Sequence, residues 1–459
     1  MALFFHFGPN TFTDSEWGTG LAEPSVFNPT RLNTTQWVQV AKDAGFNRVI
    51  LTAKHHDGFC LWSSEYTDYS VKSSSWRNGT GDVVKELALS AKEAGVDLGL
   101  YLSPWDRHEV SYGKTLECNE FYMGQMTELL TRYGEIKEVW LDGAKGEGEK
   151  DMEYFFDTWF SLIHQLQPGA VIFSDAGPDT RWIGDEAGVA GSTCWSLFNR
   201  STAKIGGTDP LSVITISNMR FLSTSRPSNR YSQGGDPSGH DWVPAECDVS
   251  IRPGLLSAED TQVLQEFAEL RKLIFSNNLA KNGLFSASST RGGTNDSRFK
   301  PFNVLEEGIY TYWAPEENQS DWELHLDLQE SLSFNVLRVQ EPIHMGQRII
   351  EFHLEIKEDG DWKKVINGTT VGYQRFLQFP TVESQHLKFV IDKTRADPFI
   401  SFLGIHMDKF SSVDNKFDNS SQLHFNSSVV LQQARWNHFL NSSELLQQTT
   451  QNHAQSAAM

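Results

Sequence analysis

Over the first 190 residues, short apolar runs alternate with amphipathic stretches of helical period. The runs are rich in β-branched and aromatic residues, as is typical of strands buried on both faces. They are Leu3–Phe7, Arg48–Ala53, Asp97–Leu102, Glu138–Leu141 and Ala170–Ser174. Between them, apolar residues recur every three or four positions, and three of the predicted helices end at Gly45, Gly95 and Gly134. This repeat of strand and helix predicts a parallel sheet or a TIM-like (β/α) barrel.

Beyond Ala187 the pattern loosens. Residues 188–240 are rich in Gly, Ser, Thr and Pro, with one strand predicted at Ser212–Ser217. Trp242–Ile251 is a further strand candidate, and Ser257–Ile274 has a clear helical period. We count about seven strands, one fewer than a complete barrel contains. We therefore expect residues 1–278 to form a barrel-like domain that lacks one βα unit.

The rest of the chain has a different periodicity. Runs such as Trp322–Leu328 and Leu387–Ile391 alternate apolar and polar residues, which predicts half-buried antiparallel strands. We expect a β-sandwich domain over residues 279–410. Residues 411–459 are dense in Asn, Ser and Gln, which predicts a disordered tail.

Composition excludes two classes of partner. The chain has 459 residues, and its 39 basic and 59 acidic side chains give a net charge of −20. This field repels phosphate backbones, so we expect no nucleic-acid partner. No apolar run approaches the roughly eighteen residues of a membrane helix, so we expect no membrane insertion. Four cysteines without C-x-x-C spacing indicate neither a zinc site nor a thioredoxin-like site.

Glycosylation sequons suggest a compartment. The triplet Asn-x-Ser/Thr occurs at Asn33, Asn78, Asn199, Asn295, Asn318, Asn367, Asn419, Asn426 and Asn441. This density favours a glycoprotein of the secretory pathway, expected to be extracellular. Residues 1–8 lack the basic and apolar regions of a signal peptide and are predicted to be a buried strand instead. We expect the chain to begin inside the mature domain.

Chemically active side chains gather where the predicted strands end, which is where barrel enzymes place their active sites. His6 ends the first strand, and Glu16 and Trp17 follow it. The other strands are followed by or end in His55, His56, Tyr101, Trp105, Trp140, Asp142, Asp175, Trp182 and Glu186. Paired carboxylates with aromatic plates suit the cleavage of a glycosidic bond, which needs one group to protonate the leaving oxygen and another to meet the oxocarbenium ion.

Several of these residues allow more than one interpretation. Asp142 directly follows a strand, and Gly143 leaves room for a substrate, but an Asp here also caps helices or closes turns. His55 and His56 allow three interpretations: a zinc site, hydrogen bonds to sugar hydroxyls, or a structural role. No third ligand is evident, and successive strand residues point to opposite sides. Cys60 is either a thiol nucleophile or a simply buried cysteine.

Taken together and in order, the motifs resemble glycoside hydrolase family 29, the retaining α-L-fucosidases, and within it the plant enzymes acting on α-1,3 and α-1,4 linkages. The matching stretches are Phe5–Gly8, Phe12–Gly18, Lys54–Phe59, Tyr101–Trp105, Val139–Gly143, Arg181–Glu186 and Trp242–Asp248. The resemblance extends to the sandwich, which is similar to the family's galactose-binding-like accessory domain. It implies a TIM-like catalytic domain and a retaining exo-fucosidase that acts on fucosylated oligosaccharides or glycoproteins.

The resemblance also implies site roles. Asp142 would be the nucleophile and Glu186 the acid and then the base, with a raised pKa before cleavage. The fucose pocket would be formed by His6, Glu16, Trp17, His55, His56, Tyr101, Trp140 and Trp182. No metal or organic cofactor is implied.

The chain departs from the family pattern after Ser250–Gly254, which runs directly into Leu255–Asp260 without the family's last βα unit. This agrees with the count of seven strands. It supports an alternative: a catalytically impaired splice or gene-model variant that acts at most as a fucose- or glycan-binding protein.

Overall fold

The computed structural model describes residues 1–145, 148–175, 177–183, 193–200, 234–247, 258–293 and 296–411. The chain divides into two compact units. The first comprises Met1–Ala187 and Leu197–Leu270, and the second Gly188–Ser196 and Arg271–Met459. The division falls within helix α7 (Ala258–Phe275). Within the described ranges, no helix is both long and apolar enough to cross a membrane.

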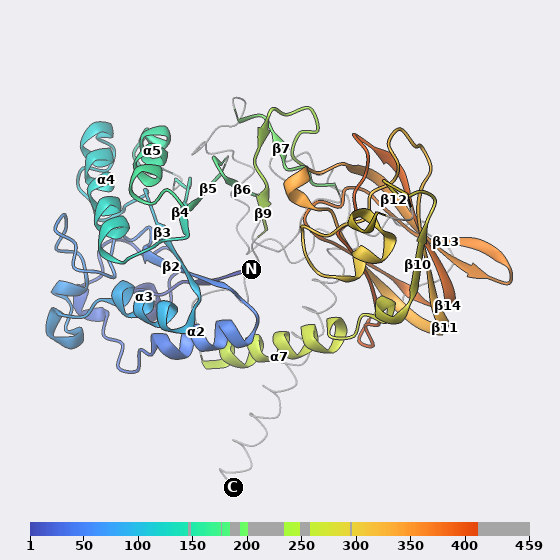
Figure 1. The fold of residues 1–459 in the computed structure, drawn as a ribbon. Helices are drawn as coiled ribbons and strands as arrows, with labels where there is room; N and C mark the ends of the chain where they lie inside the picture. Colours follow the sequence, from blue (N-terminus) through green and yellow to red (C-terminus); the bar gives the residue numbers. More distant parts are fainter. Residues whose placement is uncertain are drawn as a thin grey trace, which may run out of the picture. The chain divides into compact units, whose positions relative to one another are not determined.

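The first unit is built on a curled parallel sheet (Figure 1). Its strands are β1 (Ala2–Phe5), β2 (Arg48–Lys54), β3 (Asp97–Leu102), β4 (Glu138–Leu141), β5 (Val171–Ser174), β6 (Thr180–Trp182) and β9 (Ala245–Glu246). They lie side by side in that order, and each neighbouring pair is parallel. The predicted TIM-like architecture is therefore confirmed, and its first five strands lie where the apolar runs placed them.

Helices lie on the outer side of this sheet (Figure 1). They are α2 (Thr34–Asp43), α3 (Val83–Ala94), α4 (Thr115–Arg132) and α5 (Phe156–Leu166), with a short α1 (Asn10–Thr13) after β1. The Asn33 and Asp82 side chains accept backbone N–H groups at the starts of α2 and α3. Gly95 ends α3 with a positive φ, which glycine adopts without steric penalty.

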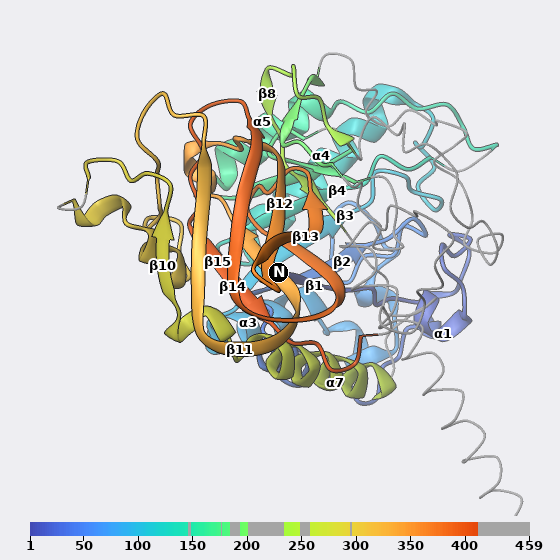
Figure 2. The ribbon, with the colours of Figure 1, turned by 90° about the vertical axis from the view of Figure 1, so that its right-hand side faces the viewer.

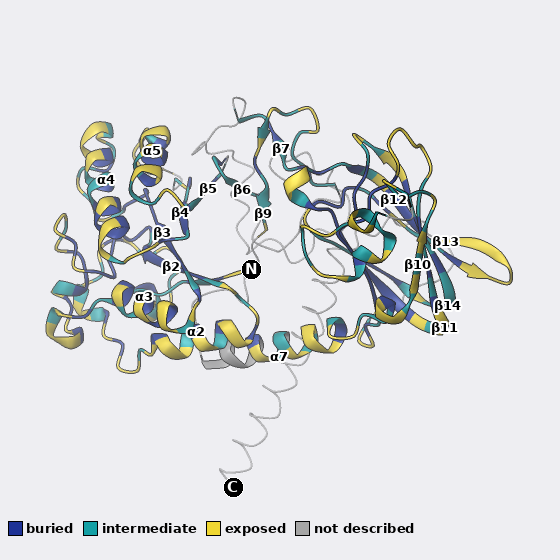
Figure 3. Ribbon diagram, in the orientation of Figure 1, coloured by how far each residue is buried: buried dark blue, intermediate teal, exposed yellow. Residues whose placement is uncertain are grey.

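Burial explains the apolar composition of the strands. All but the first residue of both β2 and β3 are buried (Figure 3), as expected of parallel strands that are covered on both faces. The polar residues Thr52, Lys54, His56 and Ser103 are nevertheless buried where these two strands end. These buried polar groups make that end of the sheet the candidate position of a functional site.

The strand predictions beyond residue 175 were less complete. β6 was missed, and Trp242–Ile251 divides into β8 (Asp241–Trp242), paired antiparallel with β7 (Leu197–Phe198), and β9. The predicted strand at Ser212–Ser217 lies outside the described residues. Within the described ranges, β1 pairs only with β2 and β9 only with β6.

The second unit is antiparallel (Figure 2). Its strands are β10 (Leu284–Ala287), β11 (Trp322–Gln340), β12 (Ile349–Glu358), β13 (Asp361–Gly368), β14 (Arg375–Thr394) and β15 (Phe402–His406). They follow the order β10-β11-β14-β12-β13, and β15 also pairs with β11. The long β11 and β14 change register between Asp327 and Leu332, which lets the strands bend around one apolar core. The predicted β-sandwich is confirmed.

Candidate active site

The ends of β1 to β4 bring together seven of the residues predicted from the sequence. Six of them carry rings, and these form a continuous chain of contacts, from His6 to His55 (centroids 4.8 Å apart), from His55 to His56 (4.2 Å) and from Trp17 to His56 (6.4 Å). Tyr101 joins this chain through His6 and His55 and also contacts Trp140. The seven residues are His6, Trp17, His55, His56, Tyr101, Trp140 and Asp142. Trp182 lies on β6, and Glu186 lies outside the described residues.

Asp142 directly follows β4 and is held by two hydrogen bonds. The Tyr101 hydroxyl donates to its Oδ2 at 2.7 Å, and the backbone N–H of Ala144 donates to its Oδ1 at 2.7 Å. His56 Nε2 stands 3.7 Å from the same Oδ2. The Asp142 side chain is 23% exposed, so its carboxylate is both oriented and reachable. These features suit a nucleophile. The hydrogen bond from Ala144 also closes a turn, which is the structural role that the sequence had left open for Asp142.

The three histidines of the site are kept neutral by burial. Burial, and to a smaller extent the nearby His56, lower the pKa of His6 to about 4, although the charge of Asp142 acts in the opposite direction. Burial also lowers the pKa of His55 and of His56, although the charge of Asp142 opposes the shift at His56. Each neutral imidazole offers one donor and one acceptor, which is the combination that binds sugar hydroxyls.

The orientation of His56 is fixed by Ser103, immediately beyond β3. The Ser103 hydroxyl donates to the backbone oxygen of Trp105 at 2.8 Å. Its oxygen must therefore accept the 2.7 Å hydrogen bond from His56 Nδ1. In neutral His56 the proton is then on Nδ1, and the lone pair of Nε2 faces the space beside Asp142. A hydroxyl placed there would donate to His56.

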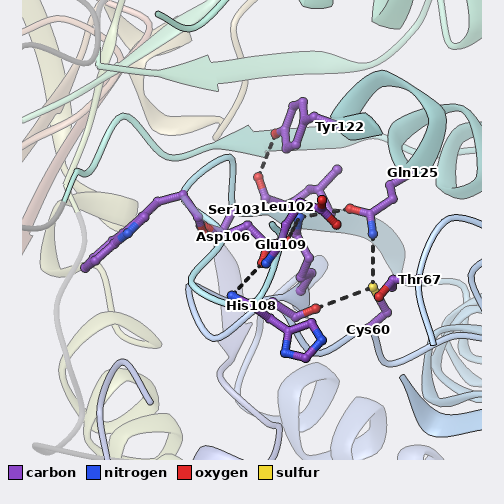
Figure 4. A network of polar contacts seen from close by, with 12 residues as sticks. Cys60, Thr67, Leu102, Ser103, Asp106, His108, Glu109, Tyr122 and Gln125 are labelled. Atoms are coloured by element: carbon purple, nitrogen blue, oxygen red, sulfur yellow. Dashed lines mark hydrogen bonds and ion pairs between the residues drawn. The ribbon is translucent and has the colours of Figure 1, made fainter. Parts of the chain in front are cut away.

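A buried polar network lies under these strand ends (Figure 4). Lys54 Nζ donates to Asp106 Oδ2 at 2.8 Å and to Gln125 Oε1 at 2.9 Å. Asp106 Oδ1 accepts the backbone N–H groups of His108 and Glu109, at 3.1 and 2.9 Å. Lys54 and Asp106 are almost completely buried. The network connects β2, the loop after β3 and helix α4, and so fixes the loop that carries Ser103 and Trp105.

A small pocket opens beside the histidines. Its polar lining includes Glu16, which sequence analysis assigned to substrate binding, and Asp57, which it did not. The lining residues are His6, Phe7, Gly8, Pro9, Asn10, Glu16, Thr52, His55, Asp57 and Phe59. The lining of this small pocket thus combines imidazoles, carboxyls and aromatic rings, the kinds of group that contact the polar and apolar faces of a sugar.

A second carboxyl approaches the Asp142 turn from the neighbouring strand. Trp140 of β4 is opposite Phe173 of β5, and their rings stack with centroids 3.8 Å apart. Asp175 follows β5, and a Cβ atom added to Gly143 would come within 2.0 Å of its Oδ2. Glycine is therefore required next to Asp142. Sequence analysis noted Asp175 at a strand end without a role, and only the strand register shows that it adjoins Asp142.

Two alternatives from the sequence lose support. Among the described residues, no group of three or more His, Cys, Asp and Glu side chains is arranged to hold a metal ion. Cys60 is completely buried, and burial raises the pKa of its thiol well above the usual value. Its sulfur lies 3.4 Å from Gln125 Nε2, within the buried network. A thiolate is therefore disfavoured at Cys60.

Comparison with known proteins gives one consistent result. The family profile described as Alpha-L-fucosidase matches residues 5–188. The chain is 63% identical over 453 residues to Alpha-L-fucosidase 1 of Arabidopsis thaliana, covering 90% of this chain and 86% of that protein. It is 55% identical to an α-L-fucosidase 1 sequence of Oryza sativa subsp. japonica, covering 94% and 87%. A Ruminococcus gnavus family 29 fucosidase in complex with fucose has a similar structure, with a TM-score of 0.77, 30% identity and coverage of 89% and 92%.

Proposed function

The chain belongs to the α-L-fucosidases of glycoside hydrolase family 29 and hydrolyses terminal α-linked fucose; on this premise we propose that Asp142 is the nucleophile of a retaining double displacement. The observation that carries the proposal is the fixed carboxylate at the end of β4, held by Tyr101 and Ala144. Two hydrogen bonds restrict its rotation and leave it accessible. The carboxylate is thereby positioned before substrate arrives.

In the first step, a carboxylate oxygen of Asp142 bonds to the anomeric carbon while the glycosidic C–O bond breaks. In the second, water attacks the same carbon and the ester to Asp142 breaks, which regenerates the carboxylate. Neutral His56 supports both steps, because its Nε2 accepts a sugar hydroxyl instead of donating to Asp142. Protonated His56 would pair with Asp142 and weaken it as a nucleophile.

The fucosyl ring would lie among the remaining side chains of the site. His6, His55 and Glu16 offer donors and acceptors to its hydroxyls, and Trp17, which is 38% exposed, offers an aromatic face to its C–H groups. Tyr101 and Trp140 form the wall behind Asp142.

We assign the acid/base role to Glu186 from the family resemblance, which also implies that Trp182 lines the fucose pocket. Glu186 would give its proton to the leaving oxygen and then take one from the incoming water. A retaining mechanism needs its carboxyl about 5–5.5 Å from that of Asp142. Glu186→Ala should slow substrates with poor leaving groups far more than activated aryl fucosides. An equal slowing of both classes would contradict this role.

Hydrolysis of an aryl α-L-fucoside, followed by proton NMR, tests the mechanism. The first product released should be the α-anomer, because two inversions restore the configuration. The Asp142→Gly variant should release no fucose, and equal release by both proteins would contradict the assignment of Asp142. Initial release of the β-anomer would exclude double displacement.

The alternative of an impaired, purely glycan-binding variant is not favoured. The chain covers 86% of its Arabidopsis relative at 63% identity. The nucleophile candidate, its two hydrogen-bond donors and the three neutral histidines are all in place in the described residues.

We also propose a preference for α-1,3 and α-1,4 linkages and a secretory, extracellular location. The linkage rests on the resemblance to the plant enzymes, and comparing isomeric fucosyl oligosaccharides tests it. The location is supported by four exposed sequon asparagines, Asn33, Asn78, Asn318 and Asn367. Mass spectrometry of the protein isolated from its natural tissue should find glycans on at least some of them. Fully unmodified asparagines would contradict the proposal.

A further inference from the structure

Asp57 is a buried carboxyl group whose hydrogen bonding is incomplete. Its side chain is 2% exposed, and its Oδ1 accepts the backbone N–H of Phe59 at 3.3 Å. Its Oδ2 has no hydrogen-bond partner among the residues that the structure describes. Buried carboxylate oxygens are almost always hydrogen-bonded in native proteins. A donor from outside the chain is therefore expected at Oδ2.

The position of Asp57 indicates which donor this is. Asp57 lines the same pocket as His6, Glu16 and His55. It also supports the turn that carries Glu16 and Trp17, because a Cβ added to Gly18 would lie 2.9 Å from the Asp57 Cβ. Asp57 is thus packed against the turn that carries the two proposed sugar-binding residues.

We propose that Asp57 is a further sugar-binding residue, whose Oδ2 accepts a hydrogen bond from one hydroxyl group of the fucosyl ring. This inference rests on the proposed function and adds an acceptor to the site. The charges around Asp57 are compatible with it. Burial and the charge of Asp106 raise its pKa to about 7, while the Phe59 hydrogen bond and the charge of Lys54 act in the opposite direction. A group that is so poorly solvated gains most from a donor that arrives with the substrate.

A bound water is the competing donor. The Tyr69 hydroxyl is a candidate second partner for this water, because it is also buried and unpartnered within the described residues. Burial raises the pKa of Tyr69, and the charge of Asp57 acts in the same direction. A water held between these two groups would occupy Oδ2 whether or not sugar is bound. The two donors are distinguished by whether the effect of Asp57 depends on one particular sugar hydroxyl.

A double-mutant cycle between protein and sugar provides the test. Calorimetry would compare the binding of L-fucose and its 2-, 3- and 4-deoxy analogues to the wild type and to Asp57→Ala. The wild type should bind one analogue roughly tenfold more weakly than fucose, because that analogue lacks the hydroxyl that donates to the carboxylate. The variant should bind the same analogue and fucose about equally, because the acceptor is already absent. If every analogue loses the same factor in both proteins, Asp57 contacts no sugar hydroxyl and the inference is wrong.

Glu341 of the second unit provides a matched control. It is also a completely buried carboxyl, and burial raises its pKa to about 7 as well. Glu341→Gln should leave all four sugar affinities unchanged, so a change there would show that loss of any buried carboxyl disturbs the pocket. Should Asp57→Ala not fold, Asp57→Asn gives the same cycle with a smaller coupling of about threefold. Wild-type fucoside hydrolysis is measured in parallel, since its absence would refute the proposed function and not this inference alone.

Discussion

Asp57 in the barrel unit and Glu341 in the sandwich unit are buried carboxyl groups whose pKa is raised to about 7 in both cases, but whose hydrogen bonding differs. Both Glu341 oxygens are used by the backbone. Oε1 accepts N–H groups of Arg348 at 2.7 Å and Ile349 at 3.0 Å, and Oε2 accepts that of Gly372 at 2.8 Å. Asp57 lines a pocket, and it has one backbone donor at Oδ1 and no partner at Oδ2 among the described residues. We therefore assign Glu341 a structural role and Asp57 a role in ligand binding.

The same contrast extends to the regions around them. In the barrel unit, buried polar side chains collect where β1 to β4 end, and their histidines are held neutral beside an accessible carboxylate. In the sandwich, Glu341 joins the loop before β12 to the loop before β14. Burial of charge alone therefore does not identify an active site. The two carboxyls are distinguished by the pocket and the unpartnered oxygen at Asp57, which Glu341 lacks.

The largest expected effect is at Asp142. Asp142→Asn should lower kcat by roughly a thousandfold or more, because the amide cannot form the covalent intermediate. The melting temperature should change little, because the side chain is partly exposed and the amide can retain both hydrogen bonds. Steady-state kinetics on an aryl fucoside and a thermal melt measure the two. Full activity in the variant would mean that the barrel site was wrongly identified.

The two buried carboxyls should differ in stability when each is neutralised. Glu341→Gln replaces an acceptor oxygen with an NH₂ group that faces backbone N–H donors, and should reduce the free energy of unfolding by about 2 kcal/mol. At pH 4, where the folded-state Asp57 carboxyl is protonated, Asp57→Asn loses no comparable bond and should change it by less than about 0.5 kcal/mol. Urea denaturation measures both. Equal losses would remove the distinction between a structural and a ligand-facing carboxyl.

Tyr101→Phe tests the orientation of the nucleophile with a smaller expected effect. Removal of the hydroxyl abolishes the 2.7 Å hydrogen bond to Asp142 Oδ2 and leaves the buried ring in place. We expect kcat to fall about tenfold to a hundredfold. The control is Tyr122→Phe, whose hydroxyl donates to the backbone oxygen of Leu102 and not to Asp142. Similar losses in both variants would indicate general damage to β3.

The pH dependence of stability should show two opposing contributions from the barrel unit. The folded-state pKa of His6 is about 4, below its ordinary 6.5, so the unfolded chain binds more protons and stability falls as pH falls from 6.5 to 4. The folded-state pKa of Asp57 is about 7, above its ordinary 3.8, so stability falls as pH rises through this range.

Melting curves between pH 4 and 7 separate these contributions. His6→Gln should be less sensitive to acid than the wild type, whereas in Asp57→Asn stability should rise more steeply with pH. Glu341→Gln should resemble Asp57→Asn, because its raised folded-state pKa has the same sign. Identical pH profiles in the wild type and His6→Gln would show that His6 is not held neutral by the fold.

The sequence was sufficient for the features that depend on neighbouring residues. β1 to β5, the helices between them and the strand-end position of Asp142 all follow from local periodicity. β6 was missed because three residues carry no measurable period. The hydrogen bonds from His56 to Ser103 and from Lys54 to Asp106 join residues 47 and 52 positions apart. Such pairs are set by strand register, which local patterns do not encode.

Asp57 shows the same limit more sharply. It lies between His56 and Gly58, within a motif that already suggested a site. Its position in the sequence did not show whether its role is structural or ligand-binding. Only the pocket and the unpartnered oxygen distinguish it. Glu341 directly follows β11, and nothing in the local sequence pattern marks it as structural. Its three backbone donors, Arg348, Ile349 and Gly372, are brought together only in the folded unit.

The most direct test of the central claim is covalent trapping of the nucleophile. A 2-deoxy-2-fluoro-fucosyl fluoride forms its glycosyl-enzyme quickly and releases it slowly, because the fluorine destabilises the oxocarbenium-like transition state and fluoride is a good leaving group. Peptide mapping by mass spectrometry should place the fluorofucosyl group on Asp142. Attachment to another carboxylate, such as the adjacent Asp175, would contradict the account.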